Sequence, residues 1–195
     1  MSENSCVETL SRFKIIPVLV LNDLDSGLKR CEMLLKNGLG VAESSFRNQA
    51  AETIIKAASK QFPEMYLGAG TILNVKDLHR AFDAGAKFAV APGFNPTVVR
   101  EAQRYSYDFA PGICTPSEIE QAYEEGCRFF KFFPAEAAGG VKMHKAIAAP
   151  YKHLGIKFMP TGGVSMENVS CYLALDEVAA DGGSWLNKAT EDEIR

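Results

Sequence analysis

The sequence lacks several features that mark other classes of protein. Its longest apolar run, at residues 15–21, holds only seven residues, and its start carries Glu3 and Glu8, so neither a membrane span nor a signal peptide is expected. Its net charge is -3, so it has no basic excess of the kind that attracts nucleic acid or anionic lipid. We therefore expect a cytoplasmic protein that binds a small molecule, and neither nucleic acid nor membranes.

The patterns that hold metals and nucleotide cofactors are also missing. The five cysteines are widely spaced and contain no C-x-x-C pair, which indicates reduced and mostly buried thiols. The histidines His79, His144 and His153 form no H-x-H or H-x-x-x-H group, and each lies in a stretch typical of an exposed helix or loop. Gly68 and Gly70 are not followed by the third glycine of a G-x-G-x-x-G motif. No metal and no organic cofactor is expected.

What the sequence does contain is a regular alternation of two patterns. Its 195 residues suit one domain over 1–195, and short apolar runs that end near Gly, Pro, Ser or Asn alternate with amphipathic stretches of helical period. The predicted strands are 15–21, 39–44, 65–70, 87–93, 107–112, 128–134, 156–163 and 177–183.

Two helix starts are indicated independently of this periodicity. Thr115 precedes a proline and Glu118, and Asn95 precedes Pro96, which are the residues of N-terminal helix caps. Eight parallel strands with helical crossovers close most naturally into an α/β fold of the (β/α)8 or TIM barrel type, and an open doubly wound sheet is the alternative. Residues 190–193 form a further capping box close to residue 195, so we expect the final helix to be missing or truncated.

Catalytic groups of such barrels lie at the carboxyl ends of the strands, and the most unusual of these ends surrounds Lys131. In FFKFF, Lys131 shares a face with Phe129 and Phe133, whereas Phe130 and Phe132 face the other way. Desolvation lowers the pKa of a lysine and turns its amine into a nucleophile toward carbonyl groups. Alternatively, the stem covers the phenylalanines while the ammonium group reaches solvent. The stretch alone does not separate these interpretations.

A carboxylate and two glycine pairs stand at other strand ends. Glu43 and Arg47 could form a helical ion pair, but Glu43 closes an apolar run, which favours a proton-transferring carboxylate with a guanidinium that grips a substrate carboxylate. Gly162-Gly163 and Gly182-Gly183, the latter followed by Ser184, could be two tight turns. Their place after the seventh and eighth strands favours a phosphate site.

Together these residues resemble a known family. GVAESSFR, GAGT, APG, FFKFFPAEAAGGVK, MPTGGV and GGSWL occur in this order at the strand ends, and they are similar to those of the 2-keto-3-deoxy-6-phosphogluconate (KDPG) aldolases, also called Entner-Doudoroff aldolases. The resemblance runs from about residue 13 to residue 186.

The resemblance implies a class I aldolase that cleaves KDPG to pyruvate and glyceraldehyde 3-phosphate, needs no metal and usually forms homotrimers. Many members also cleave 4-hydroxy-2-oxoglutarate (KHG), which has no phosphate. In such an enzyme Lys131 forms the Schiff base with the substrate and Glu43 transfers protons. The implied substrate-binding residues are Arg47 and Thr71 at the carboxylate, Pro92 and Phe133 lining the pocket, Thr161 at the aldehyde-derived part, and Gly162, Gly163, Gly183 and Ser184 at the phosphate.

The chain departs from the family pattern in three places. Ser44-Ser45 stands where an aliphatic residue and threonine are common, which would loosen the second strand without changing the chemistry. Asp181 precedes GGSW, and its carboxylate would repel phosphate if it faced that site. The third departure is the missing final helix. Two competing hypotheses therefore remain: a phosphate-binding isomerase or transferase in which Lys131 acts only electrostatically, and a non-catalytic ligand-binding relative.

Overall fold

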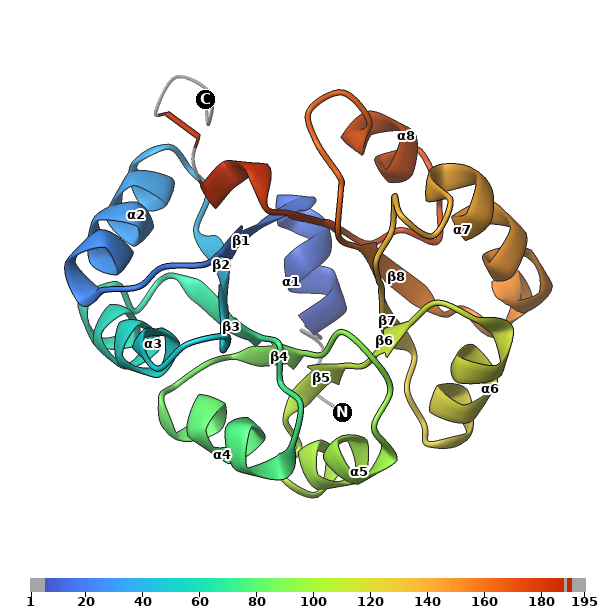
Figure 1. The fold of residues 1–195 in the computed structure, drawn as a ribbon, viewed down its shortest axis with the longest axis horizontal. Helices are drawn as coiled ribbons and strands as arrows, with labels where there is room; N and C mark the ends of the chain where they lie inside the picture. Colours follow the sequence, from blue (N-terminus) through green and yellow to red (C-terminus); the bar gives the residue numbers. More distant parts are fainter. Residues whose placement is uncertain (1–5, 188, 191–195) are drawn as a thin grey trace.

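The computed structural model describes residues 6–187 and 189–190, in which parallel strands alternate with helices. Figure 1 shows the strands curling around a central axis, with most helices on the outside. The strands are β1 (Ile15–Leu19), β2 (Val41–Ser45), β3 (Tyr66–Gly70), β4 (Phe88–Val90), β5 (Asp108–Ala110), β6 (Gly112–Ile113), β7 (Phe129–Phe132), β8 (Lys157–Pro160) and β9 (Asp181–Gly183).

Helices follow most strands in chain order. They are α1 (Cys6–Phe13), α2 (Leu24–Lys36), α3 (Ala50–Gln61), α4 (Val75–Asp83), α5 (Pro96–Arg104), α6 (Pro116–Glu124), α7 (Gly140–Ala148) and α8 (Val169–Leu173), with 3-10 turns η1 (Ala149–Leu154) and η2 (Trp185–Asn187). Within the described ranges, no helix has the length and apolar character needed to cross a membrane.

The strands form two parallel sheets, ordered β5-β4-β3-β2-β1-β9 and β6-β7-β8. Pro111 alone separates β5 from β6, so the predicted strand at 107–112 is observed as two short pieces. Parallel bridges pair Phe158 with Val178 and Thr161 with Gly182, which brings β8 beside β9. Because all strands run the same way, their carboxyl ends lie at one edge of the curled sheet.

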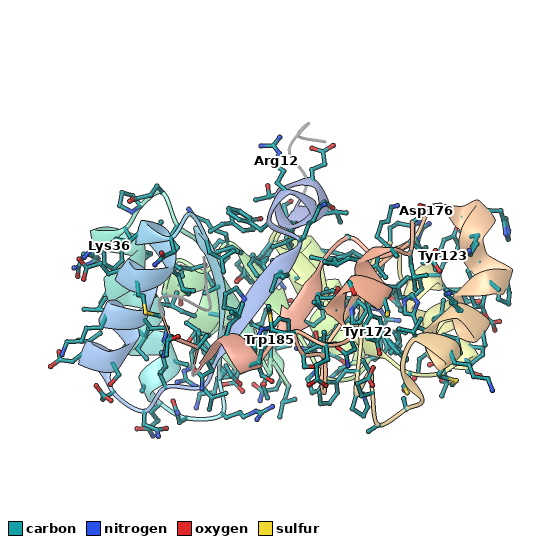
Figure 2. All side chains as sticks on the ribbon, turned by 90° about the horizontal axis from the view of Figure 1, so that it is seen from above. Arg12, Lys36, Tyr123, Tyr172, Asp176 and Trp185 are labelled. Atoms are coloured by element: carbon teal, nitrogen blue, oxygen red, sulfur yellow. The ribbon has the colours of Figure 1, made fainter. Side chains whose placement is uncertain are left out.

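The local predictions are largely confirmed. Each predicted strand overlaps an observed one, Thr115 and Glu118 form a capping box at α6, and Asn95 caps α5. No sequence pattern indicated α1, whose Leu10 packs with Ile16 and other interior side chains of the curled sheet. In Figure 1, α1 projects onto the centre of the ring of strands, and Figure 2 shows that it lies at one rim of the ring, with Arg12 on its outer side.

The core has an inner and an outer layer. Phe129 and Met159 pack inside with α1, whereas Phe130, Phe132 and Phe158 pack outside against the surrounding helices. Strand alternation therefore directs Lys131, which lies two residues after Phe129, toward the interior.

The end of the described chain packs against the first crossover helix. Arg30 Nη1 on α2 donates a hydrogen bond to the carbonyl oxygen of Ala189, at 2.6 Å. The predicted capping box at 190–193 and the final helix after it fall outside the described residues.

Candidate active site

Lys131 and Glu43 meet inside the curled sheet. Lys131 Nζ on β7 lies 3.2 Å from Glu43 Oε1 and 3.5 Å from Oε2 on β2. The side chains are only 6% and 1% exposed, so this is a buried ion pair. The ammonium group does not reach solvent, and Glu43 forms no helical pair with Arg47. The interpretation of Lys131 as a lysine whose ammonium group reaches solvent is therefore wrong, and so is that of Glu43 and Arg47 as a helical ion pair.

A glycine on β3 makes room for this pair. A Cβ atom at Gly70 would lie 1.8 Å from Glu43 Oε1, so the carboxylate occupies the space that any side chain at this position would need. Gly68 on the same strand makes room for Phe88 instead, because a Cβ there would lie 2.2 Å from its ring. The missing side chain at Gly70 thus lets Glu43 reach across toward Lys131.

Of the phenylalanines around Lys131, Phe133 has a ring close to its ammonium group. The Lys131 ammonium lies 5.8 Å from the centre of the half-buried Phe133 ring, which is a cation–π distance. Phe130 and Phe132 belong to the outer core, where they hold β7 against the helices. The prediction that Phe130 and Phe132 face away from Lys131 is therefore confirmed.

A pair of hydroxyl groups lies near the carboxyl ends of β2 and β3. Ser45 Oγ and Thr71 Oγ1 are 2.9 Å apart, and Thr71 has a φ of 62°, a left-handed conformation that is uncommon for threonine. Ser45 is 2% exposed and lies two residues after Glu43, so both side chains point to the same face. Ser45 was not among the predicted site residues, although its period-2 spacing from Glu43 indicates that it shares the same face.

Arg47 and Pro92, which are also predicted to bind the substrate, follow strand ends at the same edge of the sheet. Arg47 follows β2 by two residues, is exposed, and makes no ion pair with the described part of the chain. Pro92 follows β4 and is half-buried, and a Cβ at Gly112 would lie 2.2 Å from its backbone. A free guanidinium and a half-buried apolar wall are thus available to a ligand.

Thr161 and the glycine pairs also come together. Thr161 is 4% exposed and bridges to Gly182, and a Cβ at Gly182 would lie 2.2 Å from Thr161 Oγ1. Gly162 and Gly163 have φ values of 97° and 84°, which favour glycine, and Gly163 is exposed. Beyond the bridge lie the buried Gly183 and the exposed Ser184, so the structure places both predicted phosphate-binding segments side by side.

Asp181 is buried in β9, directly before the second of these segments. The side chain is fully buried, neither carboxylate oxygen has a hydrogen-bond partner among the described residues, and burial raises its pKa to about 8. It lies opposite to Gly182 and on the same face of β9 as Gly183, because neighbouring strand residues alternate. The effect of Asp181 on phosphate binding stays a prediction, whereas its buried carboxyl group bears directly on stability.

Stability should consequently depend on the protonation of Asp181. The carboxyl group is protonated in the folded state up to about pH 8, but an unfolded aspartate ionises near the ordinary pKa of 3.8. Unfolding releases a proton between these values, so stability should fall as pH rises from about 4 to about 8 and then level off. Asp181→Val should raise the melting temperature by roughly 5–10 °C at neutral pH and remove this slope.

The measurement is a series of melting curves between about pH 5 and about pH 9. Asp181→Asn keeps a buried polar group but cannot titrate, so it should lose the slope with a smaller gain in stability. Asp176→Asn, at an exposed carboxylate, is the control and should leave the slope unchanged. If the pH dependence of the melting temperature persists unchanged in Asp181→Val, it must come from another titrating group.

One expectation about the histidines is wrong. His144 is fully buried, its ring contacts Phe132 and Phe158 at 5.3 Å and 5.0 Å between centres, and burial lowers its pKa to about 4. His153 is exposed, and His79 pairs with Glu101. Among the described residues no group of three or more His, Cys, Asp or Glu side chains is arranged to hold a metal.

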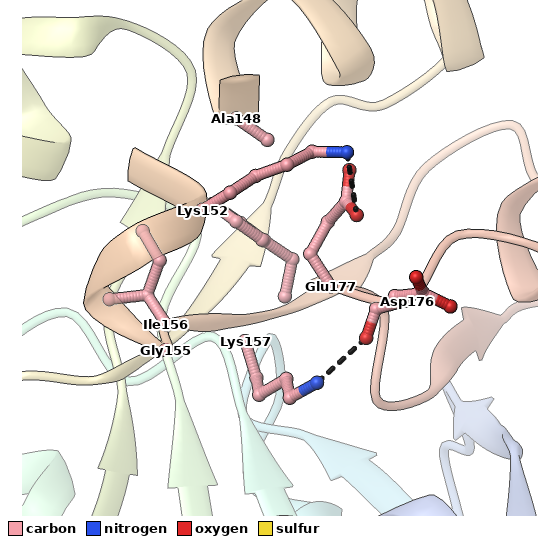
Figure 3. A pocket seen from close by; sticks show the side chains of 8 residues that line it. Ala148, Lys152, Gly155, Ile156, Lys157, Asp176 and Glu177 are labelled. Carbon is pink, nitrogen blue, oxygen red and sulfur yellow. Dashed lines mark hydrogen bonds and ion pairs between the residues drawn. The ribbon is translucent and has the colours of Figure 1, made fainter. Parts of the chain in front are cut away.

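A separate cavity of about 240 Å³ lies at the other end of β8, where the strand begins (Figure 3). Its charged groups already have partners: Lys152 Nζ lies 3.6 Å from Glu177 Oε2, and Lys157 donates to the carbonyl oxygen of Asp176 at 2.7 Å. Figure 3 shows both interactions as dashed lines. The cavity contains none of the predicted site residues, so we assign the candidate site to the Lys131 end.

A helix-covered parallel sheet that brings a buried amine and a carboxylate together defines a class of lysine-dependent enzymes that act on carbonyl compounds. Within that class, the chain belongs to the KDPG and KHG aldolase family, whose model matches residues 6–194.

Similar proteins agree with this assignment. The chain is 44% identical over 179 residues to a 2-dehydro-3-deoxy-phosphogluconate aldolase of Haemophilus influenzae, covering 92% of this chain and 84% of that protein. It is 39% identical to the KHG/KDPG aldolase of Escherichia coli, covering 94% and 85%.

Solved structures of the family have the same fold. The KDPG aldolase of Legionella pneumophila, described with pyruvate captured as a covalent carbinolamine intermediate, superposes with a TM-score of 0.89 at 34% identity, covering 94% of this chain and 88% of the other. The aldolase of Zymomonas mobilis with 3-phosphoglycerate has a TM-score of 0.89 at 32% identity, covering 97% and 91%.

Proposed function

We propose that this protein is a class I aldolase, a carbon–carbon lyase that cleaves KDPG to pyruvate and glyceraldehyde 3-phosphate. The observation that carries the proposal is the buried pair of Lys131 and Glu43, with Nζ and Oε1 only 3.2 Å apart. An amine that attacks a ketone needs a neighbouring group that exchanges protons with it at each step, and a carboxylate at this distance can do so.

In the first half of the reaction, the Lys131 amine adds to the C2 ketone and forms a carbinolamine. Proton transfer through Glu43 lets water leave, and the product is a protonated imine between Nζ and C2. This imine accepts the electron pair of the C3–C4 bond. Without it, cleavage would generate a carbanion too basic to form at neutral pH.

In the second half, Glu43 takes the proton of the C4 hydroxyl group as the C3–C4 bond breaks, so C4 becomes the aldehyde carbon of glyceraldehyde 3-phosphate. The remaining enamine takes a proton at C3 and is hydrolysed, which releases pyruvate and restores the Lys131 amine. Atoms balance because the water lost in imine formation is regained in its hydrolysis.

The neighbouring residues would bind the two ends of the substrate. Arg47 and Thr71 would hold the carboxylate next to C2, with Pro92 and Phe133 as the apolar wall and Thr161 at the C4 side. The phosphate would be bound by Gly162, Gly163, Gly183 and Ser184. Support comes from the exposed Arg47 guanidinium and from the adjacency of the two glycine segments. Holding both ends orients the C3–C4 bond against the imine.

The proposed fold closure, location, assembly and second activity are those that membership of the family suggests. We propose that the curled sheet is a closed (β/α)8 barrel, supported by the bridges between β8 and the segment around β9. The domain would span 1–195, act in the cytoplasm in the Entner-Doudoroff pathway, and form a homotrimer. Cleavage of KHG to pyruvate and glyoxylate is a second proposed activity, supported by the name of the Escherichia coli relative.

Two assays test the proposal. Incubation with pyruvate and borohydride should add one reduced pyruvyl group to Lys131, detected by intact mass and peptide mapping. Incubation with KDPG should release pyruvate and glyceraldehyde 3-phosphate in equal amounts. A protein that binds KDPG without forming either product or adduct would instead be the non-catalytic relative. Conversion of KDPG to other products, without an adduct on Lys131, would favour the isomerase or transferase.

A further inference from the structure

The loop that follows Lys131 is tied directly to the first glycine pair. The backbone N–H of Ala135 donates to the carbonyl oxygen of Thr161 at 2.8 Å, and that of Glu136 donates to the carbonyl oxygen of Gly162 at 3.0 Å. Any movement of Glu136 would therefore be transmitted to the backbone of Gly162.

The side chain of Glu136 also packs against two glycines. A Cβ at Gly163 would lie 2.6 Å from Glu136 Cβ, and a Cβ at Gly140 would lie 3.1 Å from Glu136 Oε1. Both glycines have positive φ, 84° at Gly163 and 63° at Gly140. The stem of Glu136 thus fills the space beside the Gly162–Gly163 turn and limits where that turn can lie.

Tyr172 on α8 fixes the other end of Glu136. Its hydroxyl group donates a hydrogen bond to Glu136 Oε1, whereas the tyrosine itself is fully buried. Tyr172 is labelled in Figure 2, and its ring lies 6.4 Å from that of His144. Burial, and then the contact with Glu136, raises the pKa of Tyr172, so the hydroxyl group remains a donor throughout the usual pH range.

We propose that Glu136 and Tyr172 are positioning residues, which hold the Gly162–Gly163 turn in the geometry that binds phosphate and so determine the preference for phosphorylated substrates. This inference rests on the proposed function, because it assumes that these glycines bind phosphate. The buried Tyr172 is the fixed point, and its hydrogen bond directs Oε1 of Glu136 toward α8. Without that bond the turn would loosen and the carboxylate could rotate toward the phosphate, which it would repel.

The test compares Tyr172→Phe, Glu136→Ala and Glu136→Gln with the wild type on KDPG and on the unphosphorylated KHG. Tyr172→Phe and Glu136→Ala should raise KM for KDPG and the inhibition constant of inorganic phosphate about tenfold, the effect of losing a hydrogen bond to a charged group. The kcat/KM for KHG and the yield of the pyruvate adduct should change less than about twofold. Glu136→Gln keeps the acceptor oxygen, so it should retain most of the phosphate affinity that Glu136→Ala loses.

The chain offers a matched control, because Tyr151 donates a similar hydrogen bond to Glu120 on the surface at 2.9 Å. Tyr151→Phe should leave all constants unchanged. Equal losses on KDPG and KHG, or no loss on either, would overturn the positioning role. If the wild type cleaves neither substrate, the proposed function fails, and calorimetric binding of inorganic phosphate decides the inference separately. Weaker binding by Tyr172→Phe would support it, and equal or absent binding by both proteins would overturn it.

Discussion

Replacing Lys131 by methionine is expected to abolish cleavage of KDPG and capture of pyruvate. Methionine has a similar unbranched shape but no amine, so neither the carbinolamine nor the imine can form. We expect kcat to fall at least roughly 10⁴-fold, because removal of a covalent nucleophile leaves only binding and general acid–base effects. The measurements are steady-state cleavage of KDPG and intact mass after treatment with pyruvate and borohydride.

Loss of activity has a second possible cause that the design must separate. Lys131→Met leaves Glu43 buried without its partner, and such a change destabilises proteins by about 3–5 kcal/mol. The double variant Lys131→Met/Glu43→Gln removes this unpaired charge. It should recover much of the lost melting temperature while remaining inactive. Recovery of activity together with stability would contradict the role of Lys131 as nucleophile.

Glu43→Gln alone should behave differently from Lys131→Met. The amine remains, so pyruvate should still be captured, but slowly, because proton transfer during imine formation is impaired. A fall in kcat of about 10²–10⁴-fold is expected, the usual contribution of a general acid–base group. The contrast between a slow adduct in Glu43→Gln and none in Lys131→Met assigns the separate roles.

Local sequence patterns predicted the strands and several helix starts well, since these depend on neighbouring residues. Thr115 and Glu118 are three residues apart, and their capping box formed as expected. The contact between Lys131 and Glu43 joins residues 88 positions apart. The pattern placed both residues at strand ends, but only the curvature of the sheet brings β2 opposite β7, and the sequence carries no local signal for that distance.

The errors concern side chains whose direction was not considered. The buried residues of α7 include Gly140, His144, Ile147 and Ala148, which share one helical face, so the spacing itself indicates that His144 points inward. The contact of Tyr172 with Glu136 could not be predicted in this way, because it joins a loop residue to a short helix 36 positions further along the chain.

Replacing Gly70 by alanine should reduce activity nearly as much as Glu43→Gln, without touching a reacting group. The added Cβ would lie 1.8 Å from Glu43 Oε1 and 2.6 Å from its Cδ, so the carboxylate must rotate away. Because the φ of Gly70 is not positive, alanine causes no backbone strain there. We expect kcat to fall about 10²-fold or more, since proton transfer requires hydrogen-bond distances.

The strongest test of this steric explanation is non-additivity. Gly70→Ala acts only by displacing the Glu43 carboxylate, so adding it to Glu43→Gln should cost little further activity, whereas independent effects would multiply. Gly40→Ala is the matched control, because a Cβ there would lie 3.5 Å from Leu35 Cδ2, an ordinary contact, and it should retain full activity. A fully active Gly70→Ala would show that catalysis does not need the Glu43 position beside Lys131, and would move the proton transfers to another group.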